Sequence, residues 1–227
     1  MTTSLPVVPM FHVNAWGAPY AALMVGTKLV LPGPKMVDGE TLHELMVSEK
    51  VTVSSGVPTI WMALLDYLEA NQKTAPSLKR VHVGGAACPR TIVERFRDQH
   101  NCVVVQGWGM TETSPLGTVY ATKSGMEDFS VEEVTNLQLL QGRGVFGIEM
   151  CIVGEDNKQL PWDGVASGAL KVRGPWVAKG YYGLSEKPGE EACPVDENGW
   201  FQTGDVAAIT PDGFLQITDR TKDVIKS

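Results

Sequence analysis

The sequence predicts an α/β fold in which a layered parallel-sheet part is followed by a small antiparallel part. In the first half, short apolar and β-branched runs alternate with segments in which apolar residues recur at helical spacing. Beyond about residue 142, short strand-like runs are separated by Gly and Pro turns instead. A chain of 227 residues is long enough for two such parts. We therefore place a boundary near residue 140.

Each half follows from its own pattern. Strands are predicted in the first half at residues 28–31, 51–53, 80–83 and 103–105, and helices at residues 39–50, 58–68 and 89–99. Pro58 suits the first turn of its helix. Alternating strands and helices favour a parallel sheet with helices on both faces, an αβα arrangement.

The second half predicts an antiparallel barrel or meander. Its strands are expected at residues 148–153, 168–172, 206–209 and 214–217. Turn signals such as Pro211-Asp212-Gly213 separate them. The domains expected are therefore residues 1–140 and 141–218, followed by a charged segment, residues 219–227, that leads elsewhere.

Composition excludes several classes of function. A net charge of −7 gives no support for nucleic-acid binding, which requires a basic surface. No apolar run approaches the roughly 20 residues of a transmembrane helix. The first residues lack the pattern of a secretory signal, and the four cysteines are scattered, so we expect reduced thiols in a cytoplasmic protein and no zinc site.

The most informative stretch is residues 106–112, Gln-Gly-Trp-Gly-Met-Thr-Glu, which follows an apolar strand. Ligands bind beyond the carboxyl ends of parallel strands, where glycines admit a ligand close to the backbone. Trp108 is suited to covering a base, Thr111 to binding a phosphate oxygen and Glu112 to holding magnesium. The alternative is a Gly-rich loop with a Thr cap and a first-turn Glu opening a helix. This stretch alone does not decide between them.

Five segments taken in order resemble the adenylate-forming superfamily of acyl-CoA synthetases, luciferases and adenylation domains. They are residues 9–16, 84–87, 107–113, 200–205 and 219–226. The resemblance is closest to long- or medium-chain fatty-acyl-CoA ligases, because the histidine segment continues Val-Asn-Ala-Trp. It covers nearly the whole chain and identifies it as an internal piece of the large N-terminal domain. Residues 1–140 then become the adenine-binding part, and residues 219–227 the hinge segment to a C-terminal domain.

The resemblance implies a ligase that joins a fatty acid, or another carboxylic acid, to AMP and then to coenzyme A. ATP and Mg²⁺ are the implied cofactors, and catalysis by positioning and charge stabilisation fits them. The alternatives are a ligase for an aromatic or short acid, an acyl-AMP ligase feeding a carrier protein, and a non-catalytic adenylate-binding module. A structural domain with relic motifs is the least specific alternative.

The resemblance also implies roles for individual residues. The nucleotide-binding residues are Gly84, Gly85, Ala86, Ala87, Gly107, Trp108, Gly109, Thr111, Asp205, Ile217 and Arg220. Gly84 to Ala87 would lie along adenine, with Trp108, where Tyr is usual, stacked on its other face. Asp205 would accept hydrogen bonds from the ribose hydroxyls, as a carboxylate can, and Arg220 would reach ribose or phosphate. Thr111 would contact the α-phosphate, and Glu112 would bind magnesium.

The remaining implied roles concern the acyl group and the hinge. His12 and Trp16 match the acyl side of the pocket, with His12 among the catalytic residues beside Thr111 and Glu112. Lys222 matches the hinge residue. Each assignment has a simpler alternative: a turn for Asp205 and for Gly84-Gly85, a core position for His12 and Trp16, and a solvated charged loop for Arg220 and Lys222.

Both ends of the chain look cut, and the loop that cradles the β- and γ-phosphates in this superfamily is not in the sequence. A homodimer of a longer parent and loose membrane association remain open. We expect that the 227-residue chain cannot complete adenylation by itself. Incubating the purified chain with ATP, Mg²⁺, coenzyme A and fatty acid should give no thioester, and measurable ATP-dependent thioester formation would contradict this expectation.

Overall fold

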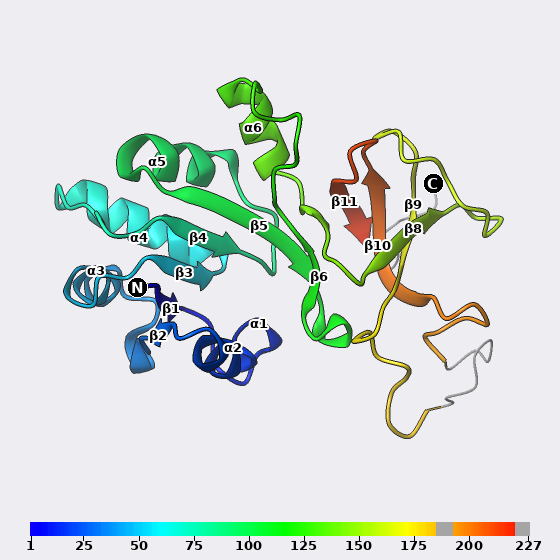
Figure 1. Ribbon diagram of the computed structural model, residues 1–227, viewed down its shortest axis with the longest axis horizontal. Coiled ribbons are helices and arrows are strands. Elements are labelled where there is room, and N and C mark those ends of the chain that lie inside the picture. Colours follow the sequence, from blue (N-terminus) through cyan, green and yellow to red (C-terminus); the bar gives the residue numbers. More distant parts are fainter. Residues whose placement is uncertain (185–192, 221–227) are drawn as a thin grey trace. The chain divides into compact units, whose positions relative to one another are not determined.

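The computed structural model describes residues 1–184 and 193–220, which form two compact units (Figure 1). Unit 1 comprises Met1–Gly107 and Thr122–Leu139. Unit 2 comprises Trp108–Ala121 and the chain from Leu140 onward. Unit 1 carries the parallel strands and unit 2 the antiparallel ones, so the predicted α/β fold class is confirmed.

Unit 1 is built on five strands in the order β2-β1-β3-β4-β5, and each pairs in parallel with its neighbours. The strands are β1 (Thr3–Pro6), β2 (Lys28–Leu29), β3 (Val53–Gly56), β4 (Arg80–Val83) and β5 (Val103–Gly109). The helices are α1 (Val13–Trp16), α2 (Ala18–Met24), α3 (Gly39–Ser48), α4 (Pro58–Ala70), α5 (Arg90–His100) and α6 (Val131–Gln138), with a 3₁₀ turn η1 at Gly33–Lys35.

Local sequence signals set the ends of these helices. The Asp38 carboxylate accepts a backbone hydrogen bond at the start of α3, and Pro58 occupies the first turn of α4. Helix α5 ends at Asn101, whose φ of 49° is the left-handed conformation that Asn tolerates. Ser130 and Glu133 form a capping box at the start of α6.

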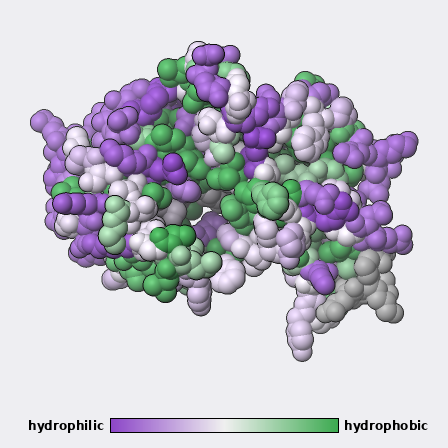
Figure 2. Space-filling model, in the orientation of Figure 1, coloured by the Kyte–Doolittle hydropathy of each residue, from purple (hydrophilic) through white to green (hydrophobic). Residues whose placement is uncertain are grey.

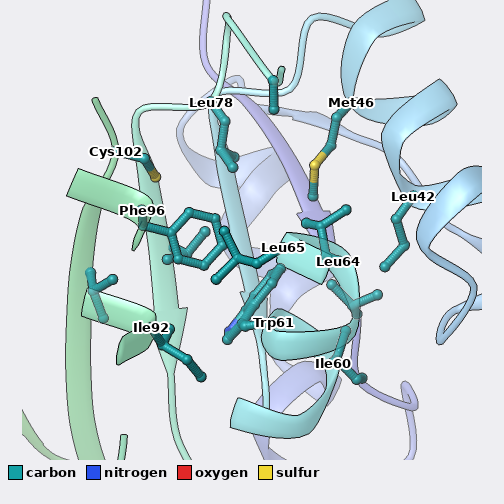
Figure 3. Close-up of a cluster of buried hydrophobic side chains, with 14 of the residues drawn as sticks. Leu42, Met46, Ile60, Trp61, Leu64, Leu65, Leu78, Ile92, Phe96 and Cys102 are labelled. Carbon is teal, nitrogen blue, oxygen red and sulfur yellow. The ribbon is translucent and has the colours of Figure 1, made fainter. Parts of the chain in front are cut away.

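The core of unit 1 centres on Trp61, which is fully buried (Figure 3). Its ring meets Phe96 of α5 edge to face, with centroids 6.0 Å apart. Its Nε1 donates to the carbonyl oxygen of His82 at 3.2 Å, so helix α4 is tied to strand β4. A Cβ at Gly56 would lie 3.0 Å from Trp61 Cζ2, and therefore the glycine that ends β3 gives the indole its space.

Unit 2 contains an antiparallel meander in which β8, β9, β10 and β11 pair in sequence order. These strands are β8 (Glu149–Val153), β9 (Ser167–Arg173), β10 (Phe201–Ile209) and β11 (Leu215–Arg220). Strands β6 (Leu116–Val119) and β7 (Arg143–Gly144) pair antiparallel and follow β5 in the strand order of the larger sheet. The 3₁₀ turn η2 spans Thr111–Thr113. The meander buries its own apolar cluster, which includes Ile152, Leu170, Val172, Phe201, Ile209 and Leu215.

The alternative given for residues 106–112, a glycine-rich loop with a threonine cap, differs from the structure. The segment Gly107-Trp108-Gly109 is the extended end of β5. The N-cap of the turn that follows is Met110, not a threonine, and this turn is a three-residue 3₁₀ helix. The glycine at 109 serves a close backbone approach, because a Cβ there would lie 1.7 Å from the Pro115 carbonyl oxygen.

All four cysteines are free thiols, and three of them are buried. Within residues 1–184 and 193–220, no helix has the length and apolar character needed to cross a membrane. Figure 2 shows apolar surface over α1 and α2 of unit 1, where several side chains are exposed: Phe11, Trp16, Tyr20, Leu23, Met24 and Val25.

We predict that Trp61→Ala lowers the free energy of unfolding by about 3–5 kcal/mol, because it leaves a cavity and removes the bond to β4. Urea unfolding followed by circular dichroism measures this change. Val47→Ala is the control: this side chain is 44% exposed, so its substitution should change stability by less than about 0.5 kcal/mol. Similar losses in both variants would contradict the role given to Trp61.

Candidate functional site

The turn after β5 is held in place by a buried threonine. The Thr113 hydroxyl oxygen accepts a hydrogen bond from the Met110 backbone N–H at 2.9 Å, and its O–H points to the backbone carbonyls of Met110 and Pro115. Thr113 is fully buried, whereas Thr111 is exposed and Glu112 is half-buried. The turn therefore presents the two predicted site residues outward from a fixed backbone.

A loop from the other side of unit 2 packs on this turn. The Trp176 indole donates to the Leu116 carbonyl at 3.1 Å, and the Ser114 hydroxyl donates to the Trp176 carbonyl at 3.0 Å. The Ala178 N–H donates to the carbonyl oxygen of Glu112 at 2.8 Å. We call residues 176–181 the clamp loop, because these bonds hold the chain at Glu112 and at two residues that follow it, Ser114 and Leu116.

The clamp loop also reaches the Glu112 side chain. The Tyr181 hydroxyl donates to Glu112 Oε1 at 2.7 Å. Partial burial of the phenol, together with this hydrogen bond to a carboxylate, raises the pKa of Tyr181 to about 12. Tyr181 is therefore a neutral donor at physiological pH.

The second carboxylate of unit 2, Asp205, is held by Trp108. The Trp108 indole Nε1 donates to Asp205 Oδ2 at 2.9 Å, and Asp205 is only 7% exposed. Strand β10 is irregular here, because its pairing register with β9 shifts between Gln202 and Val206. Gly204 has a φ of +78°, which glycine adopts without strain. A bulge of this kind changes the direction of the side chains next to it. Here the Asp205 side chain is nearly buried.

The Trp108 ring also packs closely within unit 2. A Cβ at Gly117 would lie 2.5 Å from Trp108 Cζ3, so only glycine leaves room for the ring. The indole is half-buried against the apolar cluster of the meander. Trp108 thus has a packing role as well as its bond to Asp205.

Two further predicted residues lie in β11, at the end of the meander. Arg220 stands opposite Asp205 in the β10–β11 pairing. The Ile217 N–H donates to Gln141 Oε1 at 2.6 Å, and its side chain packs against the apolar cluster. Lys222, the predicted hinge, lies outside the described residues.

Unit 1 holds the remaining predicted residues. The exposed His12 caps α1, because its Nδ1 accepts a hydrogen bond from the Asn14 N–H at 3.1 Å. Trp16, at the end of α1, is 47% exposed and so is not a core residue. A His12 that caps a helix at the surface is likewise not a core histidine.

The glycine segment of unit 1 lies next to α1. Gly84, Gly85, Ala86 and Ala87 connect β4 to α5, and all but Gly84 are exposed. Gly85 has a φ of +80°, and a Cβ there would lie 3.8 Å from Asn14 Nδ2. Unit 1 therefore brings the predicted acyl segment close to the predicted adenine segment.

The site residues fit a magnesium ion bound partly by the substrate. Within the described residues, no group of three or more His, Cys, Asp and Glu side chains could hold a metal ion. Mg²⁺ is commonly held by one or two carboxylates, substrate phosphates and water, rather than by a full cage of side chains. A single Glu112 on an exposed turn is compatible with that mode.

Sequence reasoning missed Thr113, Trp176 and Tyr181. The available signal for the clamp loop was Gly180-Tyr181-Tyr182-Gly183, two aromatic residues between glycines in a turn region. Nothing in that signal indicates which tyrosine contacts Glu112, because the two partners are 69 residues apart.

Comparison with known proteins places this geometry in context. Residues 2–182 match the family model described as AMP-binding enzyme. The chain is 48% identical over 225 residues to a medium-chain-fatty-acid–CoA ligase of Ectopseudomonas oleovorans, covering 99% of this chain and 40% of that relative. It is 45% identical to a 3-methylmercaptopropionyl-CoA ligase of Ruegeria lacuscaerulensis, covering all of this chain and 41% of that relative.

A solved structure gives the same result. O-succinylbenzoate coenzyme A synthetase from Bacillus subtilis, in complex with ATP and magnesium ion, superimposes with a TM-score of 0.78 at 26% identity. The match covers 100% of this chain and 43% of that one. The chain thus spans about two fifths of the length of the proteins it matches.

Proposed function

Because the chain belongs to the AMP-binding enzyme family, we propose that it is the AMP-binding part of an ATP-dependent fatty-acid:CoA ligase. The 48% identity to a medium-chain-fatty-acid–CoA ligase supports the choice of acid. The observation that carries the proposal is the Trp108–Asp205 hydrogen bond, since it joins a nearly buried, oriented carboxylate to the strand end that leads into the turn bearing Thr111 and Glu112.

The reaction has two steps. The carboxylate of the acid attacks the α-phosphorus of ATP, a bond forms between carboxyl oxygen and phosphorus, and pyrophosphate leaves. The thiol of coenzyme A then attacks the acyl carbon, a thioester forms and AMP leaves with the bonding electrons. Because the first step brings several negative charges together, positioning and charge stabilisation are the contributions required of the protein.

In this proposal Asp205 accepts hydrogen bonds from the ribose hydroxyls, and Arg220 and Ile217 belong to the same nucleotide-binding set. A carboxylate suits a vicinal diol because its two oxygens accept hydrogen bonds side by side. The bond from Trp108 Nε1 fixes the plane of the carboxylate before nucleotide arrives. Gly109 is a further nucleotide-binding residue of unit 2 in this proposal, and residues 84–87 and Gly107 are the nucleotide-binding residues of unit 1.

Thr111 contacts the α-phosphate in this proposal, and Glu112 holds the Mg²⁺ that neutralises the phosphate oxygens. The exposure of Thr111 and the half-buried position of Glu112 on a fixed turn suit these roles. His12 and Trp16 face the acyl group, and Lys222 is the hinge residue of the longer protein.

Fatty acid is the substrate we favour, and a short acid is the second candidate. A relative named for 3-methylmercaptopropionate, at 45% identity, supports the short acid. Pyrophosphate release by the longer protein with acids of graded length separates the two. Coenzyme A as acceptor, cytoplasmic location and a homodimer of the longer protein also belong to the proposal.

We predict that the 227-residue chain binds AMP and that Asp205→Asn weakens this binding about 10- to 100-fold, the equivalent of about 1.5–3 kcal/mol for hydrogen bonds to a charged group. Asn keeps an oxygen that accepts from Trp108, so the fold should survive the change. Isothermal titration calorimetry measures the affinity. Dideoxy-AMP, which lacks both ribose hydroxyls, should bind the two proteins equally.

The matched control is Asp156→Ala, which removes an exposed aspartate of unit 2 and should leave AMP affinity unchanged. An Asp205→Asn variant that binds AMP as well as the unmodified chain would refute the ribose role. Without the β,γ-phosphate loop in this sequence, ATP should bind within about threefold of AMP, a difference below 1 kcal/mol.

A further inference from the structure

Unit 2 contains a hydrogen bond that no part of the reaction scheme above uses. The Tyr181 hydroxyl contacts Glu112 Oε1 at 2.7 Å, across 69 residues of sequence. A glutamate on an exposed turn has three rotatable side-chain bonds, and fixing them in one arrangement opposes ligand binding through lost entropy. A second group that holds the carboxylate beforehand removes part of this penalty.

The position of Tyr181 is itself fixed. The clamp loop is joined to the turn by the Trp176 indole, the Trp176 carbonyl and the Ala178 N–H. One of these bonds ends on the backbone carbonyl of Glu112 itself. The backbone and the side chain of Glu112 are therefore both held by the same short loop, so the phenol and the carboxylate keep a constant separation.

The chemistry of the pair suits a cation ligand. A carboxylate oxygen has two lone pairs, so Oε1 can accept from Tyr181 while Oε2 binds a cation. A phenol is a neutral hydrogen-bond donor at physiological pH. A lysine or arginine in this position would cancel the negative charge that attracts the cation, whereas tyrosine orients the carboxylate and leaves its charge in place.

We infer that Tyr181 is a positioning residue, whose hydroxyl holds the Glu112 carboxylate in the orientation that binds the divalent cation. This inference rests on the proposed function, because it takes Glu112 as the metal ligand. It adds a residue outside the motif that suggested the site. Partners that orient metal-binding side chains in this way typically change metal affinity by about 10- to 100-fold when removed.

The test uses Mn²⁺ as the probe and the 227-residue chain with saturating ATP. Electron paramagnetic resonance measures free Mn²⁺ during a titration. Tyr181→Phe should weaken Mn²⁺ binding about tenfold, at the lower end of the range for such partners. Tyr182→Phe is the matched control, because the neighbouring ring is fully exposed and should leave binding unchanged. AMP affinity measured without metal should be the same in all three proteins.

A double-mutant cycle separates positioning from a general structural effect. In the Glu112→Gln background, Tyr181→Phe should have no further effect on Mn²⁺ binding, because the carboxylate it orients is gone. An equal loss in both backgrounds would overturn the inference. So would unchanged Mn²⁺ binding by Tyr181→Phe in a chain that binds AMP and Mn²⁺, and this result would leave the proposed function standing. A chain that binds neither AMP nor Mn²⁺ with ATP overturns both.

Discussion

The hydrogen bond between Trp108 and Asp205 is the interaction on which the site in unit 2 depends. It joins residues 97 positions apart, one at the end of β5 and one in the irregular part of β10. Both partners need special backbone around them. Trp108 needs the space left by Gly117, and Asp205 follows Gly204, whose φ is +78°. Two glycines of the sequence are therefore explained by the placement of a single pair of side chains.

Many regular elements of both units were predictable because they depend on local patterns, whereas β1, β6, β7, α1, α2 and α6 were not predicted. Helices α3, α4 and α5 lie where helical spacing of apolar residues indicated them, and the four strands of the meander lie close to their expected positions. Strand β3 covers Val53–Gly56 rather than residues 51–53. It includes Ser54 and Ser55, and two polar residues in a row do not indicate a strand. The Ser54 hydroxyl donates to the carbonyl oxygen of Leu5 at 2.5 Å, so a buried serine is satisfied by the neighbouring strand.

What the sequence did not reveal depends on contacts between distant segments. The glycines at 107 and 109 were compatible with a loop. The reason for Gly109 is the close approach of the Pro115 carbonyl oxygen, and a local pattern cannot show that approach. Tyr181 was missed for the same reason, as its significance lies in a partner 69 residues away. Residue chemistry and then the family resemblance predicted roles for Thr111 and Glu112, whereas the residues that hold their turn, such as Thr113 and Ala178, were not predicted.

The two predicted site carboxylates of unit 2, Asp205 and Glu112, are oriented in the same way. Asp205 accepts from an indole and Glu112 from a phenol, and both donors are neutral. A neutral donor fixes the direction of a carboxylate without forming an ion pair, so its hydrogen bond does not cancel the negative charge. A charged, oriented carboxylate suits both proposed roles, which are accepting hydrogen bonds from hydroxyl groups and binding a cation. The ion pair of Arg173 with Glu149 lowers the pKa of that acid. The aromatic donors at Asp205 and Glu112 orient two carboxylates that we propose for ligand binding.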